Sequence, residues 1–134
     1  MKLVQQVTIK LPNVPSSLAK VGDRLRSEEL NIEAISSSEN PPMIHLIVDD
    51  PETAKLVLQE LGSVTITPVI AFEVKNRPGV IANIGRACAA MGVNIRLIYA
   101  TTFGKDAMVY IAVDDASATM ELLKKWEKSA GKLS

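Results

Sequence analysis

The chain has 134 residues, of which 22% are charged and 47% hydrophobic, and its formal net charge is zero. This balance is typical of a globular protein and excludes an intrinsically disordered chain. Neutral charge and an aromatic content of 4% leave little to attract or stack bases, so no nucleic-acid partner is expected. One cysteine, Cys88, and one histidine, His45, exclude an internal disulfide and provide too few ligands for a His/Cys metal site.

No motif in the sequence indicates catalysis, a cofactor or a membrane. There is no Walker loop, zinc pattern or Ser/His/Asp spacing, so we expect no catalytic residues, no metal, no cofactor and no enzyme activity. No apolar run approaches the roughly 18 residues that a membrane span requires. The first residues also lack the apolar segment of a signal peptide. We therefore expect a cytoplasmic protein with no membrane partner.

The first half of the chain predicts strand, helix, strand, strand and helix, in that order. Alternation of apolar and polar residues or dense apolar runs predict strands at 7–11, 30–38 and 43–48. Helical spacing predicts helices from 18 to about 28 and from 50 to 61. Residues 39–42 contain two prolines and predict the turn between the second and third strands.

The second half repeats this order after an extended stretch, 64–75, which Pro68 is expected to divide into two strands, 64–67 and 69–75. A helix ending at Gly92 follows the turn at residues 76–80. The remaining predicted elements are a strand at 93–101, a hairpin turn at 103–106, a strand at 107–113, a helix from 114 to about 128 and a frayed tail at 129–134.

The two halves are copies of one pattern. A single constant offset places Asn13 on Asn76, Pro15 on Pro78, Gly22 on Gly85, Asn31 on Asn94 and Ile35 on Ile98. After the hairpins, which differ slightly in length, a slightly larger offset aligns the Asp-Asp pairs at 49–50 and 114–115, which predict helix caps. A register that slips only in a loop indicates duplication. We therefore predict two units, 1–67 and 68–134. The matched glycines, Gly22 and Gly85, are expected to mark a close approach of each helix to the sheet or to a neighbouring helix.

The repeat predicts an α+β fold made of two ferredoxin-like βαββαβ units placed side by side. Residues 64–67 close the first unit with a last strand, whereas the second unit lacks a closing strand. An open sheet edge invites pairing. We therefore expect the missing strand to be supplied by exchange, either within the chain or from a second copy in a homodimer.

The turn at residues 76–80 connects a strand to a helix and is the most distinctive motif of the second unit. Asn76 is a candidate N-cap, Pro78 fits the first helical turn, and Gly79 permits close approach of the backbone. Free backbone N–H groups at a helix N-terminus favour an anion such as a carboxylate. A plain capped turn without a ligand is the alternative interpretation.

The segments VKNRPGVI (74–81) and MGVNI (91–95) resemble the signature of ACT domains. These are small βαββαβ regulatory modules that bind amino acids and control metabolic enzymes. The turn is most similar to the serine-sensing domain of phosphoglycerate dehydrogenase, and the whole chain resembles a stand-alone tandem ACT protein. In the first unit the match is weaker, because Val14, Pro15 and Ser16 stand where the motif has Arg-Pro-Gly.

The resemblance implies a ligand site where the turn of one unit faces the second strand of the other, with Asn76 opposite Asn31 and Asn13 opposite Asn94. Those relatives carry a histidine two residues before the turn asparagine, where this chain has Val74 and Leu11, so serine is not specified. The Gly79 turn is expected to be the working site. The implied ligand-binding residues are Asn76, Arg77, Pro78, Gly79, Val80, Ile81, Asn94, Asn31 and Asn13.

These observations predict a non-catalytic, allosteric regulatory protein that binds a small-molecule amino acid and modulates a metabolic enzyme or its own assembly as a homodimer. The alternative is a ferredoxin-like protein–protein interaction module without a small ligand, which the missing closing strand also fits. An RNA-binding module on the same topology ranks last, because aromatic residues are few and the net charge is zero.

Overall fold

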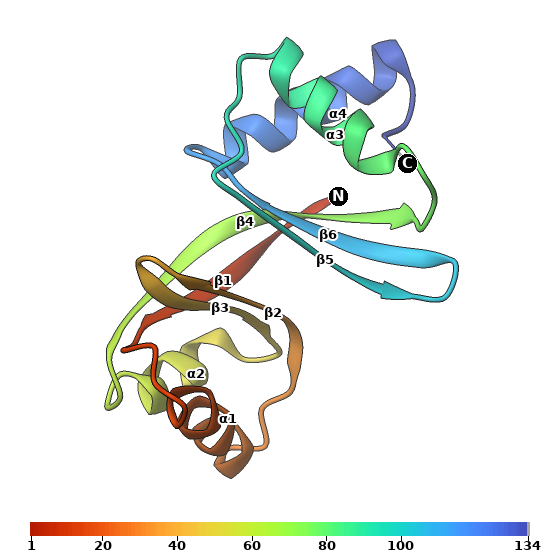
Figure 1. Ribbon diagram of the computed structural model, residues 1–134. Helices are drawn as coiled ribbons and strands as arrows, with labels where there is room; N and C mark the ends of the chain where they lie inside the picture. Colours follow the sequence, from red (N-terminus) through yellow and green to blue (C-terminus); the bar gives the residue numbers. More distant parts are fainter. Residues whose placement is uncertain (134) are drawn as a thin grey trace. The chain divides into compact units, whose positions relative to one another are not determined.

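The computed structural model describes residues 1–133 (Figure 1). In chain order the elements are β1 (Lys2–Lys10), α1 (Ser17–Ser27), β2 (Ile32–Glu39), β3 (Pro42–Val48), α2 (Pro51–Leu58), β4 (Ser63–Lys75), α3 (Val80–Ala90), β5 (Leu97–Phe103), β6 (Asp106–Ala112) and α4 (Ala116–Ala130). This order confirms the predicted α+β class and the strand–helix–strand–strand–helix pattern of each half. Within residues 1–133, no helix is both long enough and apolar enough to cross a membrane.

The chain divides into two compact units. The N-terminal unit is Gln5–Thr67, and the C-terminal unit combines Met1–Val4 with the chain from Pro68 onward. The sequence expectation placed residues 1–4 in the first unit, and the structure corrects this. The four residues group with the second repeat because β1 and β4 are hydrogen-bonded neighbours, so the start of β1 lies beside the later part of β4.

The strands are hydrogen-bonded in the order β2-β3-β1-β4-β6-β5. In the N-terminal unit β3 pairs antiparallel with both β1 and β2, and Thr8 lies opposite His45. In the C-terminal unit β6 pairs antiparallel with β4 and β5, and Tyr110 lies opposite Tyr99. The closing strand that the second repeat lacks is therefore supplied within the chain, by the first residues of β1.

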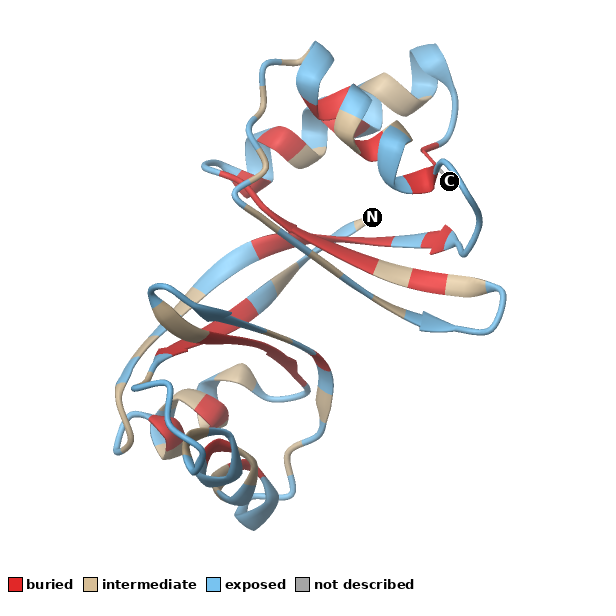
Figure 2. Ribbon diagram, viewed as in Figure 1, coloured by how far each residue is buried: buried red, intermediate tan, exposed pale blue. Residues whose placement is uncertain are grey.

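Each unit has its own hydrophobic core between its helices and one face of its strands (Figure 2). In the N-terminal unit alternate residues of β1, Val7 and Ile9, are fully buried against α1 and α2. In the C-terminal unit Ile70 and Phe72 of β4 pack with Ile84 of α3. The period-two pattern of the strands thus places one face on the helices in each unit.

The extended stretch around Pro68 is one strand rather than two. β4 continues from Ser63 to Lys75 without interruption. Pro68 lies before Ile70, where pairing with β6 begins, so its missing N–H removes no hydrogen bond from that ladder. The prediction that proline divides this stretch was therefore wrong.

Residues 129–133 are held in place, although the sequence predicted fraying over 129–134. The helix α4 extends to Ala130, and Leu133 is only 3% exposed within the C-terminal core. The backbone N–H of Leu133 donates to Oε2 of Glu127 (3.0 Å), and its carbonyl accepts from Nδ2 of Asn83 (3.1 Å). An apolar anchor and two hydrogen bonds hold this segment. The prediction for the last residue, 134, lies outside the described part.

The matched glycines do not mark a close approach, contrary to the prediction. A Cβ atom built at Gly22 or Gly85 meets no atom within 4 Å. The close approach occurs instead at Gly62, where a Cβ atom would lie 2.3 Å from the carbonyl oxygen of Lys10. Gly62 thus lets the chain pass against the end of β1 before β4 begins.

Candidate functional site

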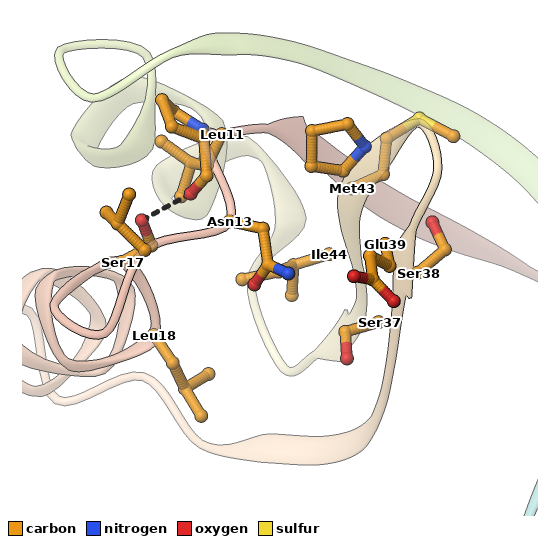
Figure 3. Close-up of a pocket in the computed structure, with 12 residues that line it drawn as sticks. Leu11, Asn13, Ser17, Leu18, Ser37, Ser38, Glu39, Met43 and Ile44 are labelled. Atoms are coloured by element: carbon orange, nitrogen blue, oxygen red, sulfur yellow. Dashed lines mark hydrogen bonds between the residues drawn. The ribbon is translucent and has the colours of Figure 1, made fainter.

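A pocket of about 310 Å³ lies at the first strand-to-helix turn, within the N-terminal unit (Figure 3). Asn13 reaches toward it from the turn, while Ser37, Ser38 and Glu39 line it from the end of β2 (Figure 3). The complete lining is Leu11, Pro12, Asn13, Val14, Ser17, Leu18, Ser37, Ser38, Glu39, Pro42, Met43 and Ile44.

The polar side chains of this pocket fall into two groups. Ser17 Oγ donates to the carbonyl of Pro12 (2.6 Å), and Ser38 Oγ donates to the carbonyl of Pro41 (2.9 Å). The side chains of Asn13, Ser37 and Glu39 make no hydrogen bond or ion pair with the described residues. Their hydrogen-bonding capacity is therefore available to a ligand.

The first turn of α1 faces the same pocket, since Ser17 and Leu18 line it. The N-cap residue, Ser16, makes no side-chain capping bond, and the first turn contains no acidic residue. The first helical hydrogen bond runs from the N–H of Lys20 to the carbonyl of Ser16 (3.0 Å). The N–H groups of Leu18 and Ala19 come before it in the chain and therefore have no partner within the helix. Such free amides, together with the helix dipole, favour a negative charge.

The second turn is built differently from the prediction. Gly79, not Asn76, is the N-cap of α3, and Pro78 precedes the helix instead of lying in its first turn. Gly79 has a φ of +95°, a conformation that favours glycine. A Cβ atom at Gly79 would meet nothing within 4 Å, so backbone conformation rather than crowding within this chain explains the glycine.

Asn76 is tied to the β5–β6 hairpin. Its backbone N–H donates to the carbonyl of Lys105 (2.8 Å), and its side-chain Nδ2 donates to the carbonyl of Gly104 (3.2 Å). Arg77 and Pro78 are exposed, Val80 is buried in the core, and Ile81 is 52% exposed. The two turn asparagines therefore differ, because the side chain of Asn76 is engaged and that of Asn13 is free.

Within each unit the structure does not bring the strand asparagine to the turn. Asn31 precedes β2, and its N–H donates to Oδ1 of Asp49 (3.1 Å), beyond the end of β3. The Asn13 turn lies at the other end of these strands, beside the β2–β3 hairpin. Asn94 likewise precedes β5, whereas Asn76 bonds to the hairpin at the far end of β5. The pairing implied by the resemblance stays a prediction.

Arg96, near Asn94, is also engaged within its own unit. Its Nε lies 3.3 Å from Oδ1 of Asp114, and its Nη2 donates to the carbonyl of Val113 (3.1 Å). Its guanidinium therefore binds the two residues that directly follow β6.

In each Asp-Asp pair the second aspartate is the helix N-cap, as predicted. Oδ1 of Asp50 accepts from the N–H of Thr53 (3.2 Å), and Oδ1 of Asp115 accepts from the N–H of Ala118 (3.0 Å). The hydrogen bond from the Thr53 hydroxyl, followed by the one from its backbone, lowers the pKa of Asp50 below its ordinary value. A carboxyl held in its ionised form by capping is unsuited to general acid chemistry at neutral pH.

The other titratable candidates are internal. Burial raises the pKa of the Cys88 thiol, which disfavours a nucleophilic thiolate. Burial lowers the pKa of His45, which contacts Thr8. In the part of the chain that the structure describes, no cluster of three His, Cys, Asp or Glu side chains could hold a metal ion.

Sequence reasoning missed the wall of the pocket that the β2–β3 hairpin provides, with Ser37, Glu39 and Met43. These residues carry no motif of their own. The signal that would have found them is topological. In a βαββ unit the third strand pairs with the first, so the hairpin lies beside the turn that follows strand one.

Residues 68–131 match the family described as ACT domain. The crystal structure of protein BT0572 from Bacteroides thetaiotaomicron is similar with a TM-score of 0.84 at 29% identity, covering 93% of this chain and 89% of that chain. The matched segment covers most of the C-terminal unit, which is thus similar to an ACT domain. No curated protein matches the sequence.

Two structures related to aspartate kinase share the fold at lower identity. The regulatory subunit of aspartate kinase from Thermus thermophilus, in a ligand-free form, has a TM-score of 0.65 at 21% identity, covering 93% of this chain and 97% of that chain. Aspartokinase III of E. coli, in complex with lysine and aspartate, has a TM-score of 0.65 at 12% identity, covering 98% of this chain and 32% of that chain. Both are evidence for the fold alone.

Proposed function

We propose that this is a non-catalytic regulatory protein that binds an amino acid in the pocket at the Asn13 turn and thereby modulates a metabolic enzyme or its own assembly. One observation carries the proposal. The pocket combines the uncapped N-terminus of α1 with the free carboxylate of Glu39. A free amino acid carries one group for each, a carboxylate and an ammonium.

The pocket has donors and acceptors for both ends of such a zwitterion. The amides of Leu18 and Ala19 at the start of α1 favour the ligand carboxylate, and Glu39 accepts hydrogen bonds from the ammonium. Asn13 carries both a donor and an acceptor on one side chain, so it can contact either group. The ligand would thus lie between the turn and the end of β2.

We rank the second turn below this pocket. That candidate site comprises Asn76, Arg77, Pro78, Gly79, Val80 and Ile81, with Asn94 and Asn31. The side-chain amide of Asn76 already donates to the hairpin, whereas that of Asn13 is free. The ranking reverses the preference for the Gly79 turn that the sequence motif favoured.

An enzyme is proposed as the regulated partner by analogy of fold. The fold occurs in a regulatory subunit of aspartate kinase and in an aspartokinase crystallised with lysine and aspartate. A separate chain with this fold can act by docking on an enzyme or by changing its own assembly. In both cases the ligand must bind one state of the protein, docked or undocked, assembled or dissociated, more tightly than the other.

Calorimetric titration of the full chain with each of the twenty amino acids tests the proposal. At least one should bind and raise the melting temperature. Glu39→Gln should weaken binding about 10–100-fold, since a hydrogen bond to a charged group is lost. The matched control is Glu33→Gln, an exposed glutamate of the same strand outside the pocket, which should leave affinity unchanged. Absence of binding by all twenty at millimolar concentration, with a folded protein, would overturn the proposal.

An interaction module without a small ligand is the second candidate. It is favoured by Ile35 on β2 and Ile98 on β5, which are 44% and 40% exposed on the outermost strands of the sheet order. Such strands can pair with another chain. Sedimentation of the wild type and of Ile35→Lys tests this candidate. If the variant no longer self-associates and none of the twenty amino acids binds the wild type, the interaction module is favoured over ligand sensing.

A further inference from the structure

We infer that the pocket at the Asn13 turn selects a neutral amino acid whose side chain is aliphatic and about the size of leucine or methionine. The inference rests on the proposed function, because it concerns the side chain of the ligand whose backbone groups bind there. Its evidence is separate, however. It comes from the charge, polarity and size of the pocket lining.

The charge of the lining excludes acidic ligands. Glu39 is the one ionisable residue among those that line the pocket, and no lysine, arginine or histidine is present there. A second carboxylate on the ligand would meet Glu39 with no cation in the lining of this pocket to offset the repulsion. The N-terminus of α1 is already required for the α-carboxylate. Aspartate and glutamate should therefore bind far more weakly than a neutral amino acid.

The same lining disfavours a basic side chain. Lysine brings two ammonium groups, and the single carboxylate of Glu39 can satisfy only one. The second ammonium would have to leave water for a wall with no further acid, which is unfavourable. Lysine should therefore bind this pocket more weakly than a neutral amino acid does.

The apolar part of the lining is suited to an aliphatic chain. It includes Leu11, Val14, Leu18, Pro42, Met43 and Ile44. Val14 and Leu18 are 49% and 58% exposed, so their surface is available for a ligand to cover. Each methylene buried against such a wall should raise affinity about fourfold.

The dimensions favour a long side chain over a short one. The pocket of about 310 Å³ adjoins a second hollow of about 370 Å³, and the two share Leu11, Pro12 and Pro42. The second hollow is completed by Lys10 and Pro41. The apolar surface therefore continues past the point where a ligand the size of alanine would end, so leucine and methionine gain contacts that alanine and glycine lack.

The second turn differs at the positions that matter for this selectivity. The offset that aligns the two turns places Arg77 at the position of Val14, so an exposed cation stands where the pocket has an aliphatic wall. The two turns are therefore unequal in the ligand side chain that they favour. An aliphatic ligand should prefer the Asn13 turn.

Calorimetry on the full chain with leucine, methionine, valine, alanine, lysine and aspartate tests the inference. Leucine and methionine should bind at least tenfold more tightly than alanine, lysine or aspartate. Leu18→Ser should weaken leucine binding about tenfold and alanine binding much less. Leu56→Ser is the control, because Leu56 is 62% exposed on α2 outside the pocket, and it should change neither affinity.

The outcomes separate this inference from the proposed function. Tighter binding of lysine or aspartate than of leucine overturns the aliphatic selectivity and leaves amino-acid sensing intact. Equal loss of leucine and alanine affinity in Leu18→Ser also overturns it, since the substitution would then act on the shared zwitterion site. If no amino acid binds the folded wild type, both proposals fail.

Discussion

Thr8 and His45 lie opposite each other on β1 and β3, with Oγ1 of Thr8 2.9 Å from Nδ1 of His45. Nε2 of Gln6, which can only donate, lies 3.2 Å from Oγ1 of Thr8 and 3.4 Å from Nδ1 of His45. The imidazole nitrogen therefore acts as an acceptor, and the ring is neutral in this arrangement. All three side chains are at least nine-tenths buried.

The buried neutral His45 predicts that the protein is less stable in mild acid. Burial lowers its pKa below the ordinary 6.5, so the unfolded chain binds a proton more readily than the folded one. The free energy of unfolding should therefore be constant above about pH 7 and fall as the pH drops below about 6.5, until the folded-state pKa is reached. Urea denaturation at a series of pH values measures this.

The control for this prediction is His45→Gln. His45 is the only histidine of the chain, so the variant should be less stable at neutral pH but lose the slope that begins as the pH falls below about 6.5. A wild-type stability that rises on acidification through this window would contradict the neutral assignment.

The two turn asparagines predict a separation of structural and binding roles. Asn76→Ala removes the hydrogen bond to the carbonyl of Gly104 and should lower the free energy of unfolding by about 0.5–1.5 kcal/mol. Asn13→Ala removes no hydrogen bond within the described residues, so it should leave stability unchanged and weaken amino-acid binding. Denaturation and calorimetry on both variants check this pair. Loss of stability in Asn13→Ala with unchanged binding would contradict it.

Much of the fold was predictable from the sequence because its signals are local or repeated. One constant offset aligns the two turns, and Asp50 and Asp115 cap their helices as their positions predict. Hydrophobic periodicity located the strands and helices to within a few residues. These features depend on neighbours close in the chain, which a single sequence contains.

Most of the failures concern partners that are distant in the chain, and one concerns a local backbone conformation. Residues 1–4 join the C-terminal unit because β1 lies beside β4, and nothing in their composition encodes that. The Asn-Arg-Pro-Gly order permits a helix start at either end, and the left-handed φ of Gly79 decides it. Glu39 enters the candidate site through strand topology. A pattern of residue types does not reveal such placements until the sheet is known.

Gly79, the N-cap of α3, and Gly85, inside α3, predict opposite effects of the same substitution. At Gly79 the φ of +95° makes alanine strained by roughly 1–2 kcal/mol, even though its Cβ would meet no atom within 4 Å. At Gly85, inside the helix with the same open space, alanine should stabilise by about 0.5–1 kcal/mol. Thermal unfolding of Gly79→Ala and Gly85→Ala should therefore shift in opposite directions. A shift in the same direction would show that a feature other than backbone conformation controls one of the positions.

Leu133 predicts that the segment after α4 contributes to the stability of the C-terminal unit. Its side chain is 3% exposed and packs in the core with Phe72, Val74 and other buried residues. Leu133→Ala should lower the free energy of unfolding by about 2–5 kcal/mol, because it removes buried methyl groups and leaves a cavity. Urea denaturation measures the loss.

Lys132→Ala is the matched control for the Leu133 prediction, since Lys132 is exposed and adjacent. It should change stability by less than about 0.5 kcal/mol. Amide hydrogen exchange adds a local readout, because the N–H of Leu133 donates to Glu127 and should be protected in the wild type but exchange quickly in Leu133→Ala. If the wild-type amide exchanges as fast as an unfolded one, the segment is not anchored, and Leu133→Ala should then destabilise the protein no more than Lys132→Ala does.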